Sequence, residues 1–176
     1  MGIVARYWLP SAAVVPQERG SEFLGPVDGA DWSDGAGFHR GFFSSFRIRA
    51  GKAVWFHWPL PTPMEIAGAN LFLDSVSLLW ETDDGARLGW MVVQHGGMER
   101  LPLTERLAEP PWVPVPHEVA EADRPYYPQA ARRLSELAIE PRLPLRFGVQ
   151  LCVMVTAESD RDGLVRFYGA GAAFAD

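Results

Sequence analysis

The run from Val54 to Pro63 limits the fold more than any other part of the chain. It reads Val-Trp-Phe-His-Trp-Pro-Leu-Pro-Thr-Pro, with three prolines at alternate positions. Proline has no backbone N–H to donate, so neither a helix nor the interior of a sheet accepts this spacing. The segment is therefore predicted to be a strand over residues 53–60 that continues as an extended, polyproline-like stretch.

Large side chains occupy both faces of this predicted strand. Neighbouring side chains of a strand point to opposite faces, so Trp55 and His57 share one face, and Val54, Phe56 and Trp58 share the other. Rings on both faces mean that the strand is either covered on both sides or leaves one side open to a partner. The sequence leaves both alternatives open.

The rest of the chain repeats the same kind of segment. Short runs rich in aromatic and β-branched residues are separated by glycine, proline, aspartate and asparagine, which is typical of a sandwich or small barrel. About eight to ten strands and one short helix predict an all-β, antiparallel, jelly-roll-like β-sandwich that forms a single domain over residues 1–176. The predicted strands cover residues 2–8, 12–17, 38–49, 53–60, 70–82, 86–94, 98–103, 145–157 and 163–171, with a short one around 112–115.

Turn residues between these strands predict how they pair. Ala50-Gly51-Lys52, Asp83-Asp84-Gly85 and the stretch 159–163 each separate two strands by a few residues, and each therefore predicts a hairpin. His95-Gly96-Gly97 predicts a further turn that leads into the strand at 98–103.

Residues 128–138 form the predicted helix. Pro128 suits a first helical turn, and Leu134, Leu137 and Ala138 recur at the spacing of one helix face. The preceding proline-rich stretch, residues 108–128, is expected to be mainly loop.

Composition excludes several classes of function. The 176-residue chain has a formal net charge of −6, a pI of about 5.2 and scattered arginines, which does not suit nucleic acid or an anionic membrane surface. It has no run of roughly 18 apolar residues and no basic start followed by an apolar stretch. A soluble, cytoplasmic protein is expected.

Metal and cofactor sites are not expected. Cys152 is the single cysteine, lies in an apolar run, and is predicted to be a small buried residue. His39, His57, His95 and His117 lack the close pairing on one strand that a cupin-like metal site shows, and no phosphate-binding glycine loop or nucleophile elbow is present. No catalytic residue is assigned.

The chain resembles an uncharacterised family of small bacterial domains, a domain of unknown function. The resemblance rests on a Trp-Phe-His-x-Pro-hydrophobic-Pro-Thr-Pro motif, here Trp55 to Pro63, with weaker matches at Gly41 to Phe43, Leu73 to Thr82, Gly148 to Val155 and Ala170 to Phe174. The chain departs from the family after residue 94. The resemblance implies a β-sandwich and no known activity.

The aromatic residues carry the functional hypothesis. They could form a stacking platform, an apolar pocket, a self-association surface or simply a tryptophan-rich core. We expect a non-enzymatic binding or assembly module whose partner is a second copy of the chain (a homo-oligomer), a sugar or an apolar small molecule. The alternative is a small β-barrel enzyme that acts on an apolar small molecule in an aromatic pocket. The candidate contact residues are Trp55, His57, Trp58, Trp90, His95 and Trp112.

Overall fold

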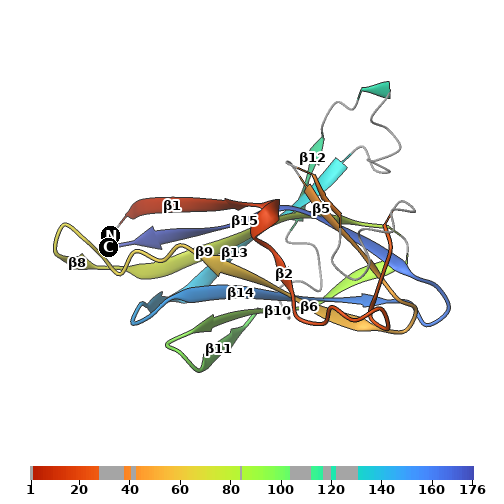
Figure 1. Ribbon diagram of the computed structural model, residues 1–176. Coiled ribbons are helices and arrows are strands. Elements are labelled where there is room, and N and C mark those ends of the chain that lie inside the picture. Colours follow the sequence, from red (N-terminus) through yellow and green to blue (C-terminus); the bar gives the residue numbers. More distant parts are fainter. Residues whose placement is uncertain are drawn as a thin grey trace.

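The computed structural model describes residues 2–27, 38–40, 43–83, 85–103, 112–116, 120–121 and 131–176. They form two antiparallel sheets that pack face to face (Figure 1), and a two-stranded ribbon of β7 (Glu65–Ile66) and β8 (Ala69–Asn70). The eight-stranded sheet contains β1 (Ile3–Pro10), β3 (Leu24–Gly25), β4 (Phe38–Arg40), β5 (Phe43–Ile48), β9 (Phe72–Thr82), β12 (Trp112–Pro116), β13 (Ala131–Pro144) and β15 (Gly163–Ala175). The five-stranded sheet contains β2 (Val15–Pro16), β6 (Ala53–Leu60), β10 (Ala86–His95), β11 (Glu99–Pro102) and β14 (Val149–Ala157).

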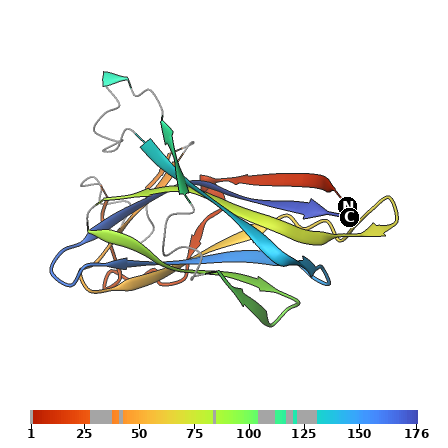
Figure 2. The ribbon, with the colours of Figure 1, turned by 180° about the vertical axis from the view of Figure 1, so that it is seen from behind.

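The order of the strands is that of a jelly roll. In the larger sheet the central strands run β5-β15-β9-β13, and in the smaller sheet they run β6-β14-β10-β11. Along the chain, each of these strands is followed by one in the opposite sheet, except that β10 and β11 form a hairpin. Two sheets wound in this way are a jelly roll, so the predicted all-β sandwich is confirmed. Figure 2 shows the two layers from behind, with both chain ends at one end of the sandwich.

Three of the four predicted turns do not make hairpins. The turns near residues 50–52, 83–85 and 159–163 carry the chain from one sheet to the other, so the strands that flank them are not hydrogen-bonded partners. The physical reason is that a short turn can join two strands of the same sheet or two strands that face each other from opposite sheets. The alternating sequence pattern is the same in both cases. The predicted turn at Gly96 and Gly97 joins β10 and β11 in a hairpin, and both glycines have a positive φ (58° and 86°).

The predicted helix at 128–138 is wrong where the structure describes it. Residues from Ala131 onward belong to β13, which pairs with β9 on one side and β12 on the other. Leu137 and Ile139 alternate with exposed neighbours and enter the core, so strand pairing prevails over the local helical spacing. A 3-10 turn forms at Ser11–Ala13.

The two sheets meet over a core of aromatic and aliphatic side chains. β6 contributes Val54, Phe56 and Trp58 to this core, and all three side chains are fully buried. Trp55 and His57 lie between them in sequence and point to the outer face of the five-stranded sheet, where they are partly exposed. The alternation predicted for this strand is therefore present, with one face in the core and the other facing outward.

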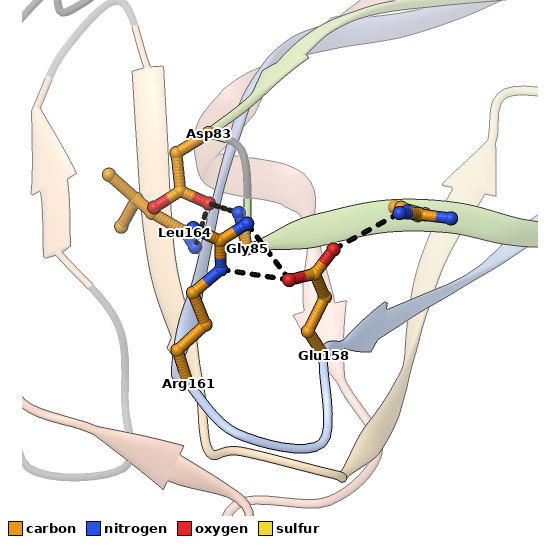
Figure 3. A network of polar contacts seen from close by, with 6 residues as sticks. Asp83, Gly85, Glu158, Arg161 and Leu164 are labelled. Carbon is orange, nitrogen blue, oxygen red and sulfur yellow. Dashed lines mark hydrogen bonds and ion pairs between the residues drawn. The ribbon is translucent and has the colours of Figure 1, made fainter.

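A polar network fixes one end of the sandwich, where the chain crosses between the sheets (Figure 3). The Asp83 carboxylate accepts hydrogen bonds from the backbone N–H groups of Gly85 (3.0 Å) and Leu164 (2.9 Å), and so joins the β9–β10 turn to the start of β15. Glu158 pairs with Arg161 at 2.8 Å beside it. Asp83 thus acts as the turn-forming residue that an aspartate at such a position is expected to be.

The helices in the described part of the chain include none that is long and apolar enough to cross a membrane.

Candidate functional site

A hollow of about 930 Å³ lies on the outer face of the five-stranded sheet. Strands β6, β10, β11 and β14 and the segment after β2 supply its walls and floor. Three of the candidate residues from the sequence, Trp55, His57 and Trp90, line it. The residues that line the hollow are Gln17, Trp55, His57, Trp90, Val92, Gln94, Arg100, Pro102, Leu103 and Cys152.

The strand register arranges this face in three rows that run across the strands. At one end is an aromatic row, in the middle a mixed row, and at the other end a polar row. The aromatic row is Trp55, Met154 and Trp90; the mixed row is His57, Cys152, Val92 and Pro102; the polar row is Gln150, Gln94 and Arg100. Successive rows are two residues apart along each strand, which places them about 7 Å apart.

Two tryptophans form the wall of the aromatic row. The ring centroids of Trp55 and Trp90 are 6.3 Å apart and their planes meet at 82°, an edge-to-face arrangement. Trp90 is 54% exposed, so its ring is available to a ligand. The Trp55 backbone N–H donates to the Glu18 carboxylate at 2.9 Å, which ties the tryptophan strand to the segment after β2.

His57 is held by polar groups on both sides of its ring. Its Nδ1 lies 2.9 Å from the amide nitrogen of Gln150 and 3.2 Å from Cys152 Sγ, and its Nε2 lies 3.1 Å from Gln17 Oε1. Because the Gln150 amide donates, Nδ1 accepts; the ring proton then sits on Nε2 and is donated to Gln17. The network therefore specifies a neutral imidazole in one tautomer.

The pKa shifts of His57 and Cys152 favour the neutral form of both side chains. Burial lowers the pKa of His57 below 6.5, and the nearby Glu18 charge opposes that shift. Burial raises the pKa of the Cys152 thiol, and the Gln150 hydrogen bond and the Arg100 charge oppose it. Near neutral pH the thiol keeps its proton and the imidazole stays uncharged, so the two do not form the thiolate–imidazolium pair of a cysteine nucleophile.

Acid is expected to destabilise the protein through His57. Since folding lowers the pKa of this histidine, the unfolded chain takes up the proton more readily. The contribution of His57 to stability is therefore full above pH 6.5 and is lost as the pH falls from there through the folded pKa. Denaturant unfolding of the wild type and of His57→Gln at about pH 8 and about pH 5 measures this. The wild type should lose stability relative to the variant on acidification, and an unchanged difference would contradict it.

The other three candidate residues lie elsewhere. Trp58 is fully buried in the core, so it cannot contact a partner, which corrects the expectation for this residue. His95 ends β10 outside the hollow, with Nδ1 3.3 Å from a Glu99 carboxylate oxygen. Trp112 belongs to the opposite sheet, where its backbone pairs with Ser135. The structure thus brings together three of the six expected residues.

Several residues of the site were not expected from the sequence. Gln17, Gln94, Gln150 and Arg100 come from four separate segments, and only the strand register brings them together. Cys152 is buried as predicted, but its contact with His57 was not foreseen. The alternation of polar and apolar residues over 149–157 was the one available signal. Within the described ranges, no group of three histidine, cysteine or acidic residues could hold a metal ion.

Comparison with known proteins gives distant likenesses of fold. No protein-family model and no curated protein matches the chain. The chain is similar to the solved structure of TmCBM61 in complex with β-1,4-galactotriose, with 11% identity, a TM-score of 0.38, and coverage of 96% of this chain and 88% of that one. It is also similar to the Agl-KA catalytic domain (10% identity, TM-score 0.37) and to the catalytic domain of a GH87 α-1,3-glucanase in complex with tetrasaccharides (10% identity, TM-score 0.39).

The match spans about a quarter of each of the latter two structures. It covers 27% of each, against 96% and 95% of this chain. At such identities and scores, nothing about the ligands or activities of these proteins carries over to the chain.

Proposed function

We propose that the chain is a non-enzymatic binding module that holds a saccharide on the outer face of its five-stranded sheet. The observation that carries this is the Trp55–Trp90 pair, which stands partly exposed at the edge of a hollow whose lining also includes the polar side chains of Gln17 and Gln94. The finer choice among the expected ligands, a sugar rather than an apolar molecule or a second copy, rests on the chemistry of those polar groups.

A sugar has two kinds of surface, and the hollow offers a match for each. The C–H face of a sugar ring is apolar and stacks on an indole ring, which also has a polar N–H edge. The hydroxyl groups both donate and accept, as do the side-chain amides of Gln17 and Gln94. The hollow is only partly enclosed, which suits a sugar chain more than an apolar molecule that must be fully covered.

The His57–Cys152 pair supports binding over catalysis. The Cys152 residue is only 1% exposed and its thiol pKa is raised, so the sulfur is neither accessible nor ionised at neutral pH. Among the described lining residues there is no carboxylate that could serve as a general acid or base beside His57. The pair instead fixes the ring of His57 in a neutral state in the middle row of the site.

Removing either tryptophan should weaken saccharide binding. Trp55→Ala and Trp90→Ala each delete one stacking surface, and each should lower affinity by about tenfold, or about 1.4 kcal/mol. Titration calorimetry of the purified chain against oligosaccharides that bind in an immobilised glycan screen measures this. Trp8→Ala is the matched control, because Trp8 is similarly exposed (48%) but lies on β1 of the opposite sheet.

Two results would contradict the proposal. In the first, Trp8→Ala weakens binding as much as the two site variants do. In the second, no oligosaccharide binds, and light scattering shows an oligomer that Trp90→Ala dissociates. The second result would assign the tryptophan surface to self-association instead.

A further inference from the structure

The charge of the hollow is uneven. Arg100 is the one residue among its described lining that is charged at neutral pH. It takes part in none of the ion pairs formed among the described residues, although the chain as a whole is acidic. Its field reaches the floor of the hollow, because the Arg100 charge acts on the Cys152 thiol. An exposed cation that has no acidic partner among the described residues is available to a ligand.

Arg100 does not stand alone. It lies opposite Gln94 in the β10–β11 pair, and Gln94 lies opposite Gln150 in the β10–β14 pair. The Arg100 guanidinium and the Gln94 amide thus place N–H donors side by side on two paired strands. The Gln150 amide next to them donates to His57 Nδ1 and to Cys152 Sγ. The combination of Arg100 and Gln94 suits a carboxylate or sulfate, since a guanidinium binds such oxygens through two parallel hydrogen bonds and an amide adds further donors.

The opposite end of the site carries negative charge. Glu18 accepts from the Trp55 backbone N–H at 2.9 Å, so its carboxylate lies beside the aromatic row. An anionic group is therefore repelled at the tryptophan end and attracted at the Arg100 end. From Trp90 to Gln94 the strand advances four residues, or about 13 Å, which is longer than one sugar ring.

We infer that the ligand is an acidic oligosaccharide. One of its sugar rings stacks on Trp55 and Trp90, and the carboxylate or sulfate of another unit meets Arg100 and Gln94. This inference rests on the proposed saccharide-binding function and adds the charge of the ligand and its direction along the sheet.

Matched pairs of oligosaccharides test this inference. A uronate-containing trisaccharide such as trigalacturonate is compared with its methyl ester, which keeps the linkage and removes the charge. A sulfated trisaccharide is compared with its unsulfated parent. The wild-type chain, Arg100→Gln and Arg100→Lys are titrated with each member. Arg87→Gln is the control, because it removes the same charge from the same sheet outside the hollow.

The acidic member of a pair should bind the wild type about tenfold more tightly than the neutral member. Arg100→Gln should abolish this preference, Arg100→Lys should keep part of it, and Arg87→Gln should leave it intact. Raising the salt concentration should weaken the acidic member selectively. A preference within the uronate pair or within the sulfated pair identifies which anion the site accepts, and either supports the inference.

The outcomes separate this inference from the proposed function. Equal binding of acidic and neutral members, lost in Trp90→Ala but unchanged in Arg100→Gln, overturns the acidic ligand and leaves saccharide binding in place. If the Arg100→Gln variant still prefers the acidic member as strongly as the wild type does, the inference is overturned as well. Binding of no member of either pair or of the wider glycan screen overturns both.

Discussion

Replacing Phe167 with alanine is expected to lower the free energy of unfolding by about 3–5 kcal/mol, the cost of deleting a fully buried aromatic ring. Phe167 of β15 is completely buried between the sheets. Its ring centroid lies 5.0 Å from that of Phe56, 5.9 Å from that of Trp58 and 6.3 Å from that of Phe46. Its loss would leave a cavity that these three rings, drawn from both sheets, can fill only in part.

Chemical denaturation followed by circular dichroism measures this loss. Phe147→Ala is the matched control, since Phe147 is 62% exposed and its removal should change stability by no more than about 0.5 kcal/mol. Phe167→Leu keeps part of the volume and should fall between the two. Equal stabilities of the Phe167→Ala and Phe147→Ala variants would show that the rings at the sheet interface do not hold the sandwich together.

Phe56 also explains why part of the site could be predicted from the sequence. The alternation of residues 54–58 is a local property of an extended chain, and the prolines that follow exclude a helix. The assignment of Phe56 to one face and of Trp55 and His57 to the other therefore needed no knowledge of the fold. Knowledge of the fold was needed to decide which face enters the core, because both faces carry large rings.

The pairing of strands could not be predicted in the same way. His57 lies opposite Cys152, 95 residues further along the chain, and no local signal records that register. A turn such as 50–52 is compatible with a hairpin and with a crossing to the other sheet. The long-range core contacts decide between them, among them the Phe46–Phe56 ring contact at 4.8 Å between β5 and β6. The polar row of the hollow depends on the same register.

The helix expected at 128–138 failed for a related reason. Leu134 and Leu137 fit one helix face, but in β13 they point to opposite faces of the strand. Leu137 shares its face with Ile139, and both side chains enter the core. This short run fits both the spacing of a helix face and the two-residue alternation of a strand, and pairing with β9 and β12 selects the strand.

The second large effect is expected at the outer face of the eight-stranded sheet. Glu81 of β9 and Arg166 of β15 form an ion pair at 3.2 Å, with side chains only 2% and 3% exposed. Arg166 also lies over the Phe43 ring, 5.4 Å from its centroid. Burial raises the pKa of Glu81, and the attraction of Arg166 opposes that shift without cancelling it. The desolvation of the carboxylate therefore outweighs the attraction within the pair.

Glu81→Ala is expected to destabilise the protein by about 3–5 kcal/mol, because it leaves the Arg166 guanidinium buried without its partner. Glu81→Gln should cost less, since the amide resembles the protonated acid that burial favours. Replacing both residues by methionine removes the two buried charges together, and this variant should be close to the wild type in stability or above it.

The pH dependence of unfolding checks the sign of this effect. A carboxyl group whose pKa is raised by folding contributes its full stability below its ordinary pKa of 4.5 and loses it as the pH rises through the folded pKa. The wild type should therefore lose stability relative to the double methionine variant as the pH rises through this range. If the double variant is as unstable as Glu81→Ala, and the difference from the wild type does not change with pH, the pair is a net stabilising contact. Its attraction would then exceed its desolvation cost.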